Sequence, residues 1–427
     1  MDIPDRVSNW IAGRESFARS HNFFDKLNPA TGFALCRVTS SGATDVGAAV
    51  TAARAAQPGW AAMPPVRRGA LLHEMAQRMK ARREEIARIA HLETGKSFKE
   101  ALGETDGATA LALFFAGEGQ RLYSRTRTSG LEQRLALSVR QPIGVAGLII
   151  AANTPVANAA WKIFPALICG NAVVLKTAED TPATGWIFGS LAAEAGLPPG
   201  VLNIVQGFGR EAGAPLVEHP DVGVISFTGS SAVGRWIAET AGKRLARVSL
   251  ELGGKNPLVV CDDADLDNAV RWAALSAFSN AGQRCAAASR IIVMDGIYNR
   301  FRAAFLEKTR SLKCGPADSD DLGPVINERQ LENMLAAVHQ AEDQGAAIIA
   351  GGHRVTDDPV RAHGFYMAPT IVEGADPDAA ISQNELFGPI TCLYCVPDFE
   401  AALALANHST YGLTASIHTA NLHRGME

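Results

Sequence analysis

Short apolar runs alternate with segments of helical length from Val145 onward, and this alternation is the feature that most limits the fold. The first set consists of apolar runs at 145–152, 172–176, 201–205 and 223–227, with a helical segment at 183–195. Runs that are short and apolar throughout are typical of parallel strands covered by helices on both faces. The pattern therefore predicts an α/β fold with mostly parallel sheets.

A second set of the same kind begins near Asn256, just after a pair of glycines at 253 and 254 that can act as a joint. It contains predicted helices at 266–278, 298–310 and 332–344 and predicted strands at 289–294, 347–350 and 390–396. We place a domain boundary at the glycine pair because the α/β pattern starts again beyond it.

The segment 121–142 differs from both sets because two polar, β-prone runs flank a turn at Ser129 and Gly130. This pattern predicts a protruding β-hairpin that is suited to a subunit contact. We therefore expect one domain from 1–120 and 143–252, the hairpin at 121–142, and a second domain from 253–427.

Composition excludes two classes of protein. Lys and Arg total 40 and Asp and Glu total 44, so the net charge is −4 and there is no basic stripe to attract nucleic acid or a membrane surface. No apolar run approaches the roughly 18 residues that cross a bilayer, and the N-terminus lacks the apolar core of a secretory signal. Seven cysteines, an odd number, favour free thiols and a cytoplasmic location.

Cys285 is a candidate nucleophile because it follows a Gly-Gln-Arg loop and is surrounded by small residues that leave room above the sulfur. Arg284 and nearby N–H groups are expected to favour the reactive thiolate. The alternative is a buried structural thiol, and the segment alone does not decide between them. Cys392 and Cys395 have the spacing of a redox or metal pair, but residues three apart on a strand face opposite ways, so we expect no metal site there.

Four other positions carry weaker signals. Glu251 lies between two leucines, where desolvation would suit a general base, although a strand-end surface glutamate is the simpler interpretation. The segment 227–235 joins a strand to a helix start that could bind a pyrophosphate or merely pack tightly. Asn153 and Lys176 follow strands at their carboxyl ends, where open α/β sheets bind ligands.

Together these pieces closely resemble the aldehyde dehydrogenase superfamily, over essentially the whole chain. The motifs that carry the resemblance are Asn28-Pro-Ala-Thr-Gly32, Ala152-Asn153 with Trp161-Lys, Gly170-Asn-Ala-Val-Val-Leu-Lys176, Gly196-Leu-Pro-Pro-Gly-Val-Leu-Asn203, Phe227-Thr-Gly-Ser230, Leu250-Glu-Leu-Gly-Gly-Lys-Asn-Pro257, Gly282-Gln-Arg-Cys285 and Glu385-Leu-Phe-Gly-Pro389. The resemblance implies a Rossmann-like cofactor domain, an α/β catalytic domain and a protruding oligomerisation hairpin.

The resemblance also implies a role for each matching residue. Cys285 would attack the aldehyde carbon, Asn153 and the Cys285 N–H would form the oxyanion hole, and Glu251 would activate the hydrolytic water. The expected cofactor residues are Lys176 and Glu179 for the adenosine ribose, Gly229 and Ser230 for the pyrophosphate, and Glu385 and Phe387 for the nicotinamide ribose and ring.

Two carboxylates narrow the predicted activity to the oxidation of an aldehyde to a free acid with NAD. Relatives that pass the acyl group to coenzyme A typically lack a carboxylate at the position of Glu251. Glu179 would repel a 2′-phosphate, which favours NAD over NADP. The alternatives are a coenzyme A acylating enzyme, an enzyme that uses NADP, and an impaired homologue that binds NAD without turnover.

Two departures from the family pattern bear on these expectations. Ala-Ala precedes Asn153 where many relatives have Pro-Trp, which alters the expected wall of the substrate tunnel. The chain also stops at Glu427, soon after a predicted strand at 411–418, whereas relatives continue through a substrate loop and a strand that pairs with another subunit. We therefore expect weak activity and low stability, with a homodimer or homotetramer only if that segment is dispensable.

Overall fold

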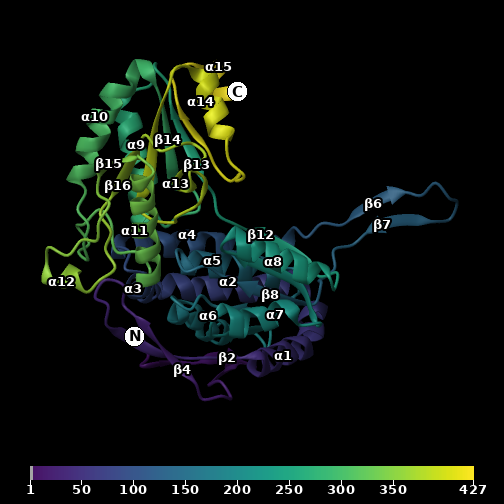
Figure 1. Cartoon of the computed structure of the whole chain (residues 1–427). Helices are drawn as coiled ribbons and strands as arrows, with labels where there is room; N and C mark the ends of the chain where they lie inside the picture. Colours follow the sequence, from purple (N-terminus) through teal and green to yellow (C-terminus); the bar gives the residue numbers. More distant parts are fainter. Residues whose placement is uncertain (1–2) are drawn as a thin grey trace. The chain divides into compact units, whose positions relative to one another are not determined.

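The computed structural model describes residues 3–427 as two compact units, and Figure 1 labels most of their helices and several of their strands. Unit 1 contains the chain up to Lys26, Ala34–Glu93 and Ala101–Leu252. Unit 2 contains Leu27–Phe33, Thr94–Glu100 and Gly253–Glu427. The last passage of the chain from unit 1 to unit 2 lies between Leu252 and Gly253, at the start of the glycine pair.

Two short segments differ from the expected division, because 27–33 and 94–100 belong to unit 2 and not to the first domain. Hydrogen bonds of their own explain this placement. The N–H of Phe365 donates to the Pro29 carbonyl (2.9 Å), and the N–H of Asn280 donates to Glu100 Oε1 (3.1 Å).

Unit 1 is built on a seven-stranded sheet in the order β12-β11-β8-β9-β10-β2-β3. The five strands from β12 to β10 are parallel, and β8, β9 and β10 are buried at every residue, which agrees with their continuous apolar runs. The strands are β12 (Arg247–Glu251), β11 (Val222–Thr228), β8 (Val145–Ile149), β9 (Ala172–Lys176), β10 (Leu202–Val205), β2 (Asn9–Ile11) and β3 (Arg14–Ser16). A smaller sheet joins β1 (Arg6–Val7), β5 (Ala34–Thr39) and β4 (Phe23–Leu27).

Helices cover both faces of this sheet. One face packs on α1 (Ala43–Ala62), α7 (Ala214–Glu218) and α8 (Ser231–Gly242) through a shared apolar core. The other face carries the remaining residues of β9, which are also buried. It is covered by α5 (Pro155–Ile168) and α6 (Pro182–Glu194), which contact β9 and β10. The remaining long helices are α2 (Pro65–Ala81), α3 (Arg83–Thr94) and α4 (Phe98–Gly117).

The predicted hairpin is present as β6 (Arg125–Thr128) and β7 (Leu135–Ser138), which pair antiparallel (Figure 1). All eight residues of the two strands are exposed. Leu135 and Leu137 remain 70% and 56% exposed, so this ladder has apolar side chains with no cover inside the chain.

Unit 2 has a six-stranded sheet in the order β15-β16-β17-β14-β13-β18, parallel except for the antiparallel edge strand β15. Its strands are β13 (Asn256–Val260), β14 (Ala288–Met294), β15 (Ala347–Ala350), β16 (Thr370–Glu373), β17 (Ile390–Val396) and β18 (Ser416–His418). One face packs on α9 (Leu266–Phe278) and α10 (Asp295–Ser311), and the other on α11 (Glu328–Asp343), α13 (Ala380–Gln383) and α14 (Phe399–Asn407). Two short helices, α12 (Pro359–Ala362) and α15 (Leu422–Met426), complete the unit.

Cysteine positions agree with the expectation of free thiols. All seven are unpaired, and on β17 Cys392 is buried while Cys395 is exposed, as the alternation of a strand requires. Within residues 3–427, no helix combines the length and the apolar character needed to cross a membrane.

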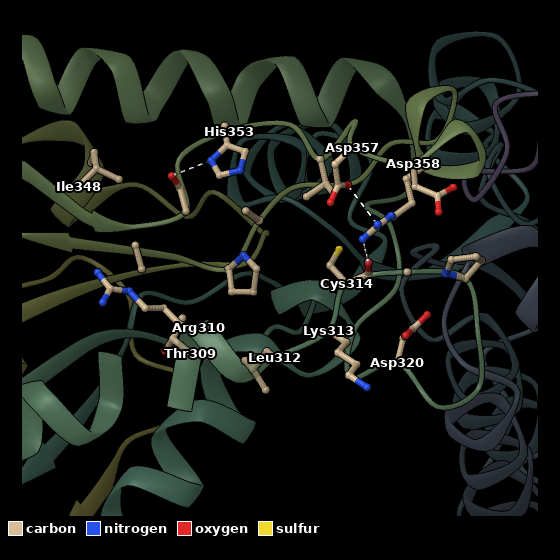
Figure 2. Close-up of a pocket in the computed structure, with 18 of the residues that line it drawn as sticks. Thr309, Arg310, Leu312, Lys313, Cys314, Asp320, Ile348, His353, Asp357 and Asp358 are labelled. Carbon is tan, nitrogen blue, oxygen red and sulfur yellow. Dashed lines mark hydrogen bonds and ion pairs between the residues drawn. The ribbon is translucent and has the colours of Figure 1, made fainter. Parts of the chain in front are cut away.

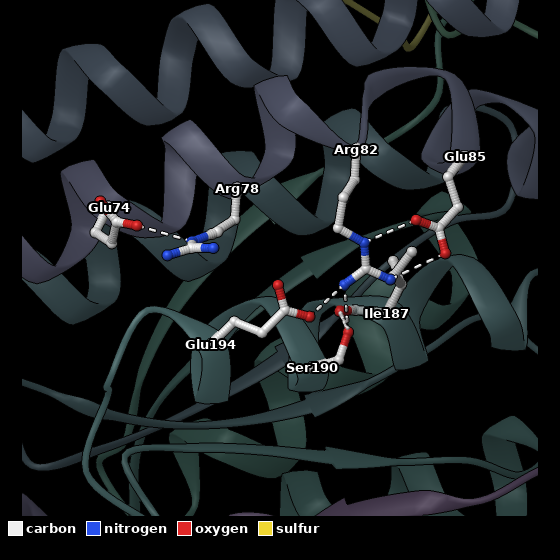
Figure 3. A network of polar contacts seen from close by, with 7 residues as sticks. All are labelled: Glu74, Arg78, Arg82, Glu85, Ile187, Ser190 and Glu194. Atoms are coloured by element: carbon white, nitrogen blue, oxygen red, sulfur yellow. Dashed lines mark hydrogen bonds and ion pairs between the residues drawn. The ribbon is translucent and has the colours of Figure 1, made fainter. Parts of the chain in front are cut away.

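Arg82, which follows α2, ties the α2–α3 junction to α6 (Figure 3). Its guanidinium donates to both carboxylate oxygens of Glu85 (2.7 and 3.0 Å), to Ser190 Oγ (3.1 Å) and to Glu194 Oε1 (2.6 Å). The hydrogen bond from Arg82 lowers the pKa of Glu85. The ionised form of Glu85 therefore stabilises the fold.

The pKa of Glu93, in the last turn of α3, is shifted in the opposite direction to that of Glu85. Its carboxylate is fully buried at the N-terminus of α6, where it accepts from the N–H groups of Ala183 (2.7 Å) and Thr184 (2.8 Å) and from the Thr184 hydroxyl (2.6 Å). Burial raises the pKa of Glu93 to about 7, although these bonds and Lys26 act in the other direction. The folded chain thus keeps a proton on Glu93 at pH values where the unfolded chain has released it.

We predict that the free energy of unfolding of Glu93→Gln increases relative to that of the wild type as the pH rises from 4.5 to about 7. A raised folded-state pKa means that the stability associated with the bound proton is lost across that interval, whereas the amide of Gln does not titrate. Urea unfolding at a series of pH values measures the difference in the free energy of unfolding.

Glu85→Gln is the matched control for this experiment. Because the pKa of Glu85 is lowered, the contribution of this residue to stability should be lost as the pH falls. The stability difference between variant and wild type should therefore change with pH in opposite directions for Glu85→Gln and Glu93→Gln. A Glu93→Gln difference that stays constant with pH would contradict the assignment.

Candidate active site

The six predicted site residues of unit 1 follow the carboxyl ends of parallel strands. Because neighbouring parallel strands end at the same edge of a sheet, these residues share one edge, which is where open α/β sheets bind ligands. Asn153 follows β8, Lys176 ends β9 and Glu179 lies three residues further, Gly229 and Ser230 follow β11, and Glu251 ends β12.

Lys176 and Glu179 form an ion pair beyond β9. The Lys176 side chain is only 3% exposed, and its Nζ lies 3.0 Å from Glu179 Oε2, whereas the Glu179 side chain is 35% exposed. An ammonium donor and a partly exposed carboxylate acceptor at this position suit the two hydroxyls of a ribose.

The turn between β11 and α8 presents a helix N-terminus. Ser230 is the N-cap of α8, and its Oγ accepts from the N–H of Val233 (3.4 Å). The N–H of Gly229 donates to the Glu251 carbonyl (3.0 Å), which joins this turn to the end of β12. Ser230 and the first turn of α8 are accessible, so the positive end of the helix dipole can receive an anion.

The donors and acceptors of this edge fit a dinucleotide. They comprise a carboxylate and an ammonium group for a ribose and an accessible helix N-terminus for a pyrophosphate, on neighbouring strands of one sheet. Within unit 2, the Glu385 carboxylate is half-buried and accepts from the N–H of Gly254 (3.2 Å).

Asn153 lies in the loop between β8 and α5, and its side chain has an internal partner. Asn158 Nδ2 donates to Asn153 Oδ1 (3.4 Å) and to Thr154 Oγ1 (3.2 Å). Because the amide oxygen of Asn153 receives this bond, the orientation of its NH₂ donor is set from within unit 1. The start of α5 is in turn capped by Glu104 Oε1, which accepts from the N–H of Val156 (2.8 Å).

Glu251 is exposed, so the simpler interpretation as a strand-end surface glutamate is confirmed, and its setting differs from the apolar, desolvated one that would suit a general base. Strand alternation explains the difference. Leu250 and Leu252 pack against the core of unit 1, so Glu251 between them points the other way.

Lys162 on α5 lies close enough to Glu251 for the carboxylate to influence it. Lys162 is 7% exposed, and its Nζ donates to Ser226 Oγ on β11 (2.8 Å). Burial lowers the pKa of Lys162 to about 8, and the charge of Glu251 opposes this shift. The motif Trp161-Lys contained this residue, but nothing in the pattern indicated that it would lie near Glu251.

Cys285 follows a strained turn in unit 2. Three successive residues, Asn280, Ala281 and Gly282, have positive φ angles of 52°, 51° and 67°. A left-handed Asn or Ala is costly and persists only where the surroundings fix it. Here a Cβ on Gly282 would lie 2.0 Å from the Gly388 carbonyl oxygen, so the turn is packed tightly against the loop that carries Glu385 and Phe387.

Gln283 holds the same turn through three hydrogen bonds. Its Nε2 donates to the carbonyls of Asn280 and Pro324 (both 3.3 Å), and its Oε1 accepts from the N–H of Ile326 (2.8 Å). The sequence motif Gly-Gln-x-Cys marked this glutamine, but its role as the anchor of the turn emerges only from the structure.

The Glu385 carboxylate rests directly on the glycine pair. A Cβ on Gly253 would lie 1.7 Å from Glu385 Oε2, so only glycine leaves room for the carboxylate there. Phe387, two residues later, has a φ of 55°, a strained value for an aromatic residue. Strain at two neighbouring loops is typical of a functional site.

The predicted lowering of the Cys285 pKa was wrong. Cys285 is exposed, but partial desolvation of its thiol and the charge of Glu385 raise its pKa and outweigh the N–H groups of Cys285 and Ala286 and the charge of Arg284. Arg284 braces the loop by donating to Ser279 Oγ (2.9 Å). Glu385 is one hundred positions away in sequence, so its effect could not be read from the residues beside Cys285.

A cavity of about 930 Å³ in unit 2 lies apart from these residues, none of which lines it. Figure 2 shows Arg310 and Lys313 near one part of the cavity and Asp357 and Asp358 near another. Arg361 forms an ion pair with Asp357 (3.1 Å) and donates to the Cys314 carbonyl (3.1 Å), so part of this charge is neutralised internally.

Comparison with known proteins assigns the chain to a family. The Aldehyde dehydrogenase family model matches residues 17–427. α-Ketoglutaric semialdehyde dehydrogenase of Bacillus subtilis (strain 168) is 39% identical over 419 residues, which are 97% of this chain and 86% of that protein. 2-Aminomuconic semialdehyde dehydrogenase of Danio rerio is 37% identical over 425 residues, which are 98% of this chain and 86% of that protein.

Solved structures agree with this assignment and with the predicted fold. Betaine aldehyde dehydrogenase of Staphylococcus aureus in complex with NAD+ has a TM-score of 0.96 and 31% identity, and the match covers 98% of this chain and 84% of that one. The α/β architecture expected from the sequence is thereby confirmed as that of the solved relatives. The chain belongs to the aldehyde dehydrogenase family.

Proposed function

We propose that Cys285 is the nucleophile with which this enzyme oxidises an aldehyde to a carboxylic acid, in a reaction that reduces NAD. The observation that carries the proposal is the strained turn 280–282, which holds an accessible cysteine on a rigid loop. A nucleophile must approach a carbonyl carbon in a fixed direction, and a loop fixed in this way restricts that approach.

Attack by the Cys285 sulfur places a negative charge on the former carbonyl oxygen. We assign the stabilisation of this oxyanion to the Asn153 amide and the Cys285 N–H. The bond from Asn158 to Asn153 Oδ1 supports this role, because it identifies the oxygen end of the amide and thereby sets the direction of its NH₂ group. Bound NAD supplies the acceptor for the hydride that leaves the substrate carbon.

Loss of the hydride leaves a thioester on Cys285, which water must hydrolyse. We assign activation of this water to Glu251, which is accessible at the end of β12 and so can reach solvent. The presence of Glu251 favours hydrolysis over transfer to coenzyme A.

Lys176 and Glu179 would hold the adenosine ribose of NAD, with Gly229 and Ser230 at the pyrophosphate and Glu385 and Phe387 at the nicotinamide end. The carboxylate of Glu179 would repel a 2′-phosphate, so NAD is preferred over NADP. NADH production from α-ketoglutaric semialdehyde and betaine aldehyde, measured with and without coenzyme A, tests the reaction on substrates named for the relatives.

We further propose that unit 1 carries the NAD site, that unit 2 carries the nucleophile, and that the hairpin forms a subunit contact in a homo-oligomer. Free cysteines suit a reducing, cytoplasmic environment. The exposed Leu135 and Leu137 lie on one face of β7 and suit burial against another subunit.

The first prediction from the proposed function is that Cys285→Ala abolishes aldehyde oxidation and leaves the NAD dissociation constant within about twofold of the wild type. The thiol forms the covalent bond, whereas the proposed NAD residues of unit 1 are untouched. Steady-state NADH formation and calorimetric titration with NAD measure the two quantities. Turnover near the wild-type rate would disprove the assignment of Cys285.

The second prediction is that Glu251→Gln separates the two half-reactions. Attack and oxidation do not need this carboxylate, but hydrolysis does, so stopped-flow mixing should give one burst of NADH per active site followed by slow turnover. A variant with a normal steady-state rate would show that another residue activates the water.

The third prediction concerns the hairpin. Leu135→Asp combined with Leu137→Asp should shift the protein to smaller assemblies in light scattering, because charges on an apolar contact oppose its burial. Ala136→Asp, on the opposite face of the same strand, is the control and should leave the assembly unchanged. An unaltered mass for the double variant would count against a subunit contact through this face.

A further inference from the structure

We propose that Asn256 is a positioning residue for the nucleophile, because its side chain orients the peptide group that joins Cys285 to Ala286. The proposal rests on the proposed role of Cys285 and adds a residue to which the motif itself assigns no chemistry. All the contacts involved lie within unit 2.

Asn256 opens β13 and is 4% exposed. Its Nδ2 donates to the carbonyl oxygens of Cys285 (2.6 Å) and Ala287 (3.0 Å), and its Oδ1 accepts from the N–H of Thr414 (3.2 Å). Both amide hydrogens and the amide oxygen are therefore used. The reverse orientation would set an oxygen against two carbonyl oxygens, so only this one is compatible with the loop.

The bond to the Cys285 carbonyl controls a second group in the same peptide plane. A peptide unit is planar and trans, so the carbonyl of Cys285 and the N–H of Ala286 point in opposite directions. Fixing the carbonyl toward Asn256 thus directs the Ala286 N–H to the other side of the plane. That N–H is one of the two that favour the thiolate form of Cys285.

The hydrogen bond from Asn256 also polarises the peptide group that joins Cys285 to Ala286, and this effect favours the thiolate as well. An amide donor on the carbonyl oxygen withdraws electron density from the peptide group and makes its N–H a stronger donor. Asn256 therefore offsets part of the effect of burial and of Glu385, which hold the Cys285 pKa above its ordinary value. Without Asn256, the thiol should be harder to ionise.

Close packing around Asn256 leaves little freedom for another arrangement. A Cβ on Gly254 would lie 2.6 Å from Asn256 Oδ1 and 3.1 Å from the Cys285 carbonyl oxygen. The glycine in this motif thus allows the asparagine and the nucleophile loop to approach one another.

The chain offers a matched control in Asn203, a fully buried asparagine on β10 with the same bonding pattern. Its Nδ2 donates to two carbonyls, those of Val173 (3.2 Å) and Gly200 (2.7 Å), and its Oδ1 accepts from the N–H of Ala12 (3.0 Å). None of these partners is a predicted site residue. Asn203→Ala therefore measures what the loss of such an amide does to stability alone.

The experiment compares Asn256→Ala and Asn203→Ala in the full chain, with both changes neutral so that no new charge acts on the thiol. The rate of alkylation of Cys285 by iodoacetamide is followed against pH, with the peptide that contains Cys285 quantified by mass spectrometry. We expect Asn256→Ala to raise the apparent pKa of Cys285, which slows alkylation at pH 7 by about tenfold for a shift of one unit. Asn203→Ala should lower the melting temperature by a comparable amount but leave the pH profile of Cys285 alkylation unchanged.

An unchanged profile for Asn256→Ala, or an equal change for Asn203→Ala, would overturn the proposal. Asn256→Ser, which keeps one short donor, is the second variant if Asn256→Ala does not fold. It should shift the pH profile of alkylation in the same direction, and an unchanged profile would again refute the proposal. Alkylation does not depend on turnover, so this result is separate from the test of Cys285 as nucleophile, in which Cys285→Ala would remain active if the proposed function were wrong.

Discussion

Parallel pairing of the central strands is the constraint on which the site of unit 1 depends. Parallel strands bring all their carboxyl ends to one edge, and the residues that follow β8, β9, β11 and β12 therefore meet there although the sequence separates them widely. The same pairing leaves the N-terminus of α8 open at that edge, next to the end of β12. The NAD contacts that we propose in unit 1 and the proposed water-activating carboxylate all lie at this edge.

In unit 2, the loop that carries Cys285 is held by its surroundings. It follows a left-handed turn at 280–282 that is secured by Gln283, by Glu100 and by close contact with the Gly388 carbonyl. Asn256 then fixes the backbone on the far side of Cys285. Conformational strain in the turn is thus balanced by hydrogen bonds from several separate segments.

The parts of this account that could be predicted from the sequence have local causes. Continuous apolar runs indicated β8, β9 and β10, a turn between two polar runs indicated the β6–β7 hairpin, and strand alternation placed Cys392 and Cys395 on opposite faces. The motifs around Glu251 and Cys285 indicated the family, which the comparisons then established.

The parts that could not be predicted depend on residues that meet only in the folded chain. Burial and the charge of Glu385, one hundred positions away, together raise the pKa of Cys285, and Lys162 reaches the neighbourhood of Glu251 from a separate helix. In each case the residue type was visible in the sequence, but its electrostatic partner was not.

The most direct test of the central claim is to identify the covalent intermediate itself. Glu251→Gln protein mixed with NAD and an aldehyde substrate, then quenched in acid, should show by mass spectrometry a mass gain equal to the acyl group, on the peptide that contains Cys285. The account predicts this adduct, formed in step with the burst of NADH. An adduct on another residue, or NADH formation with no adduct at all, would contradict it.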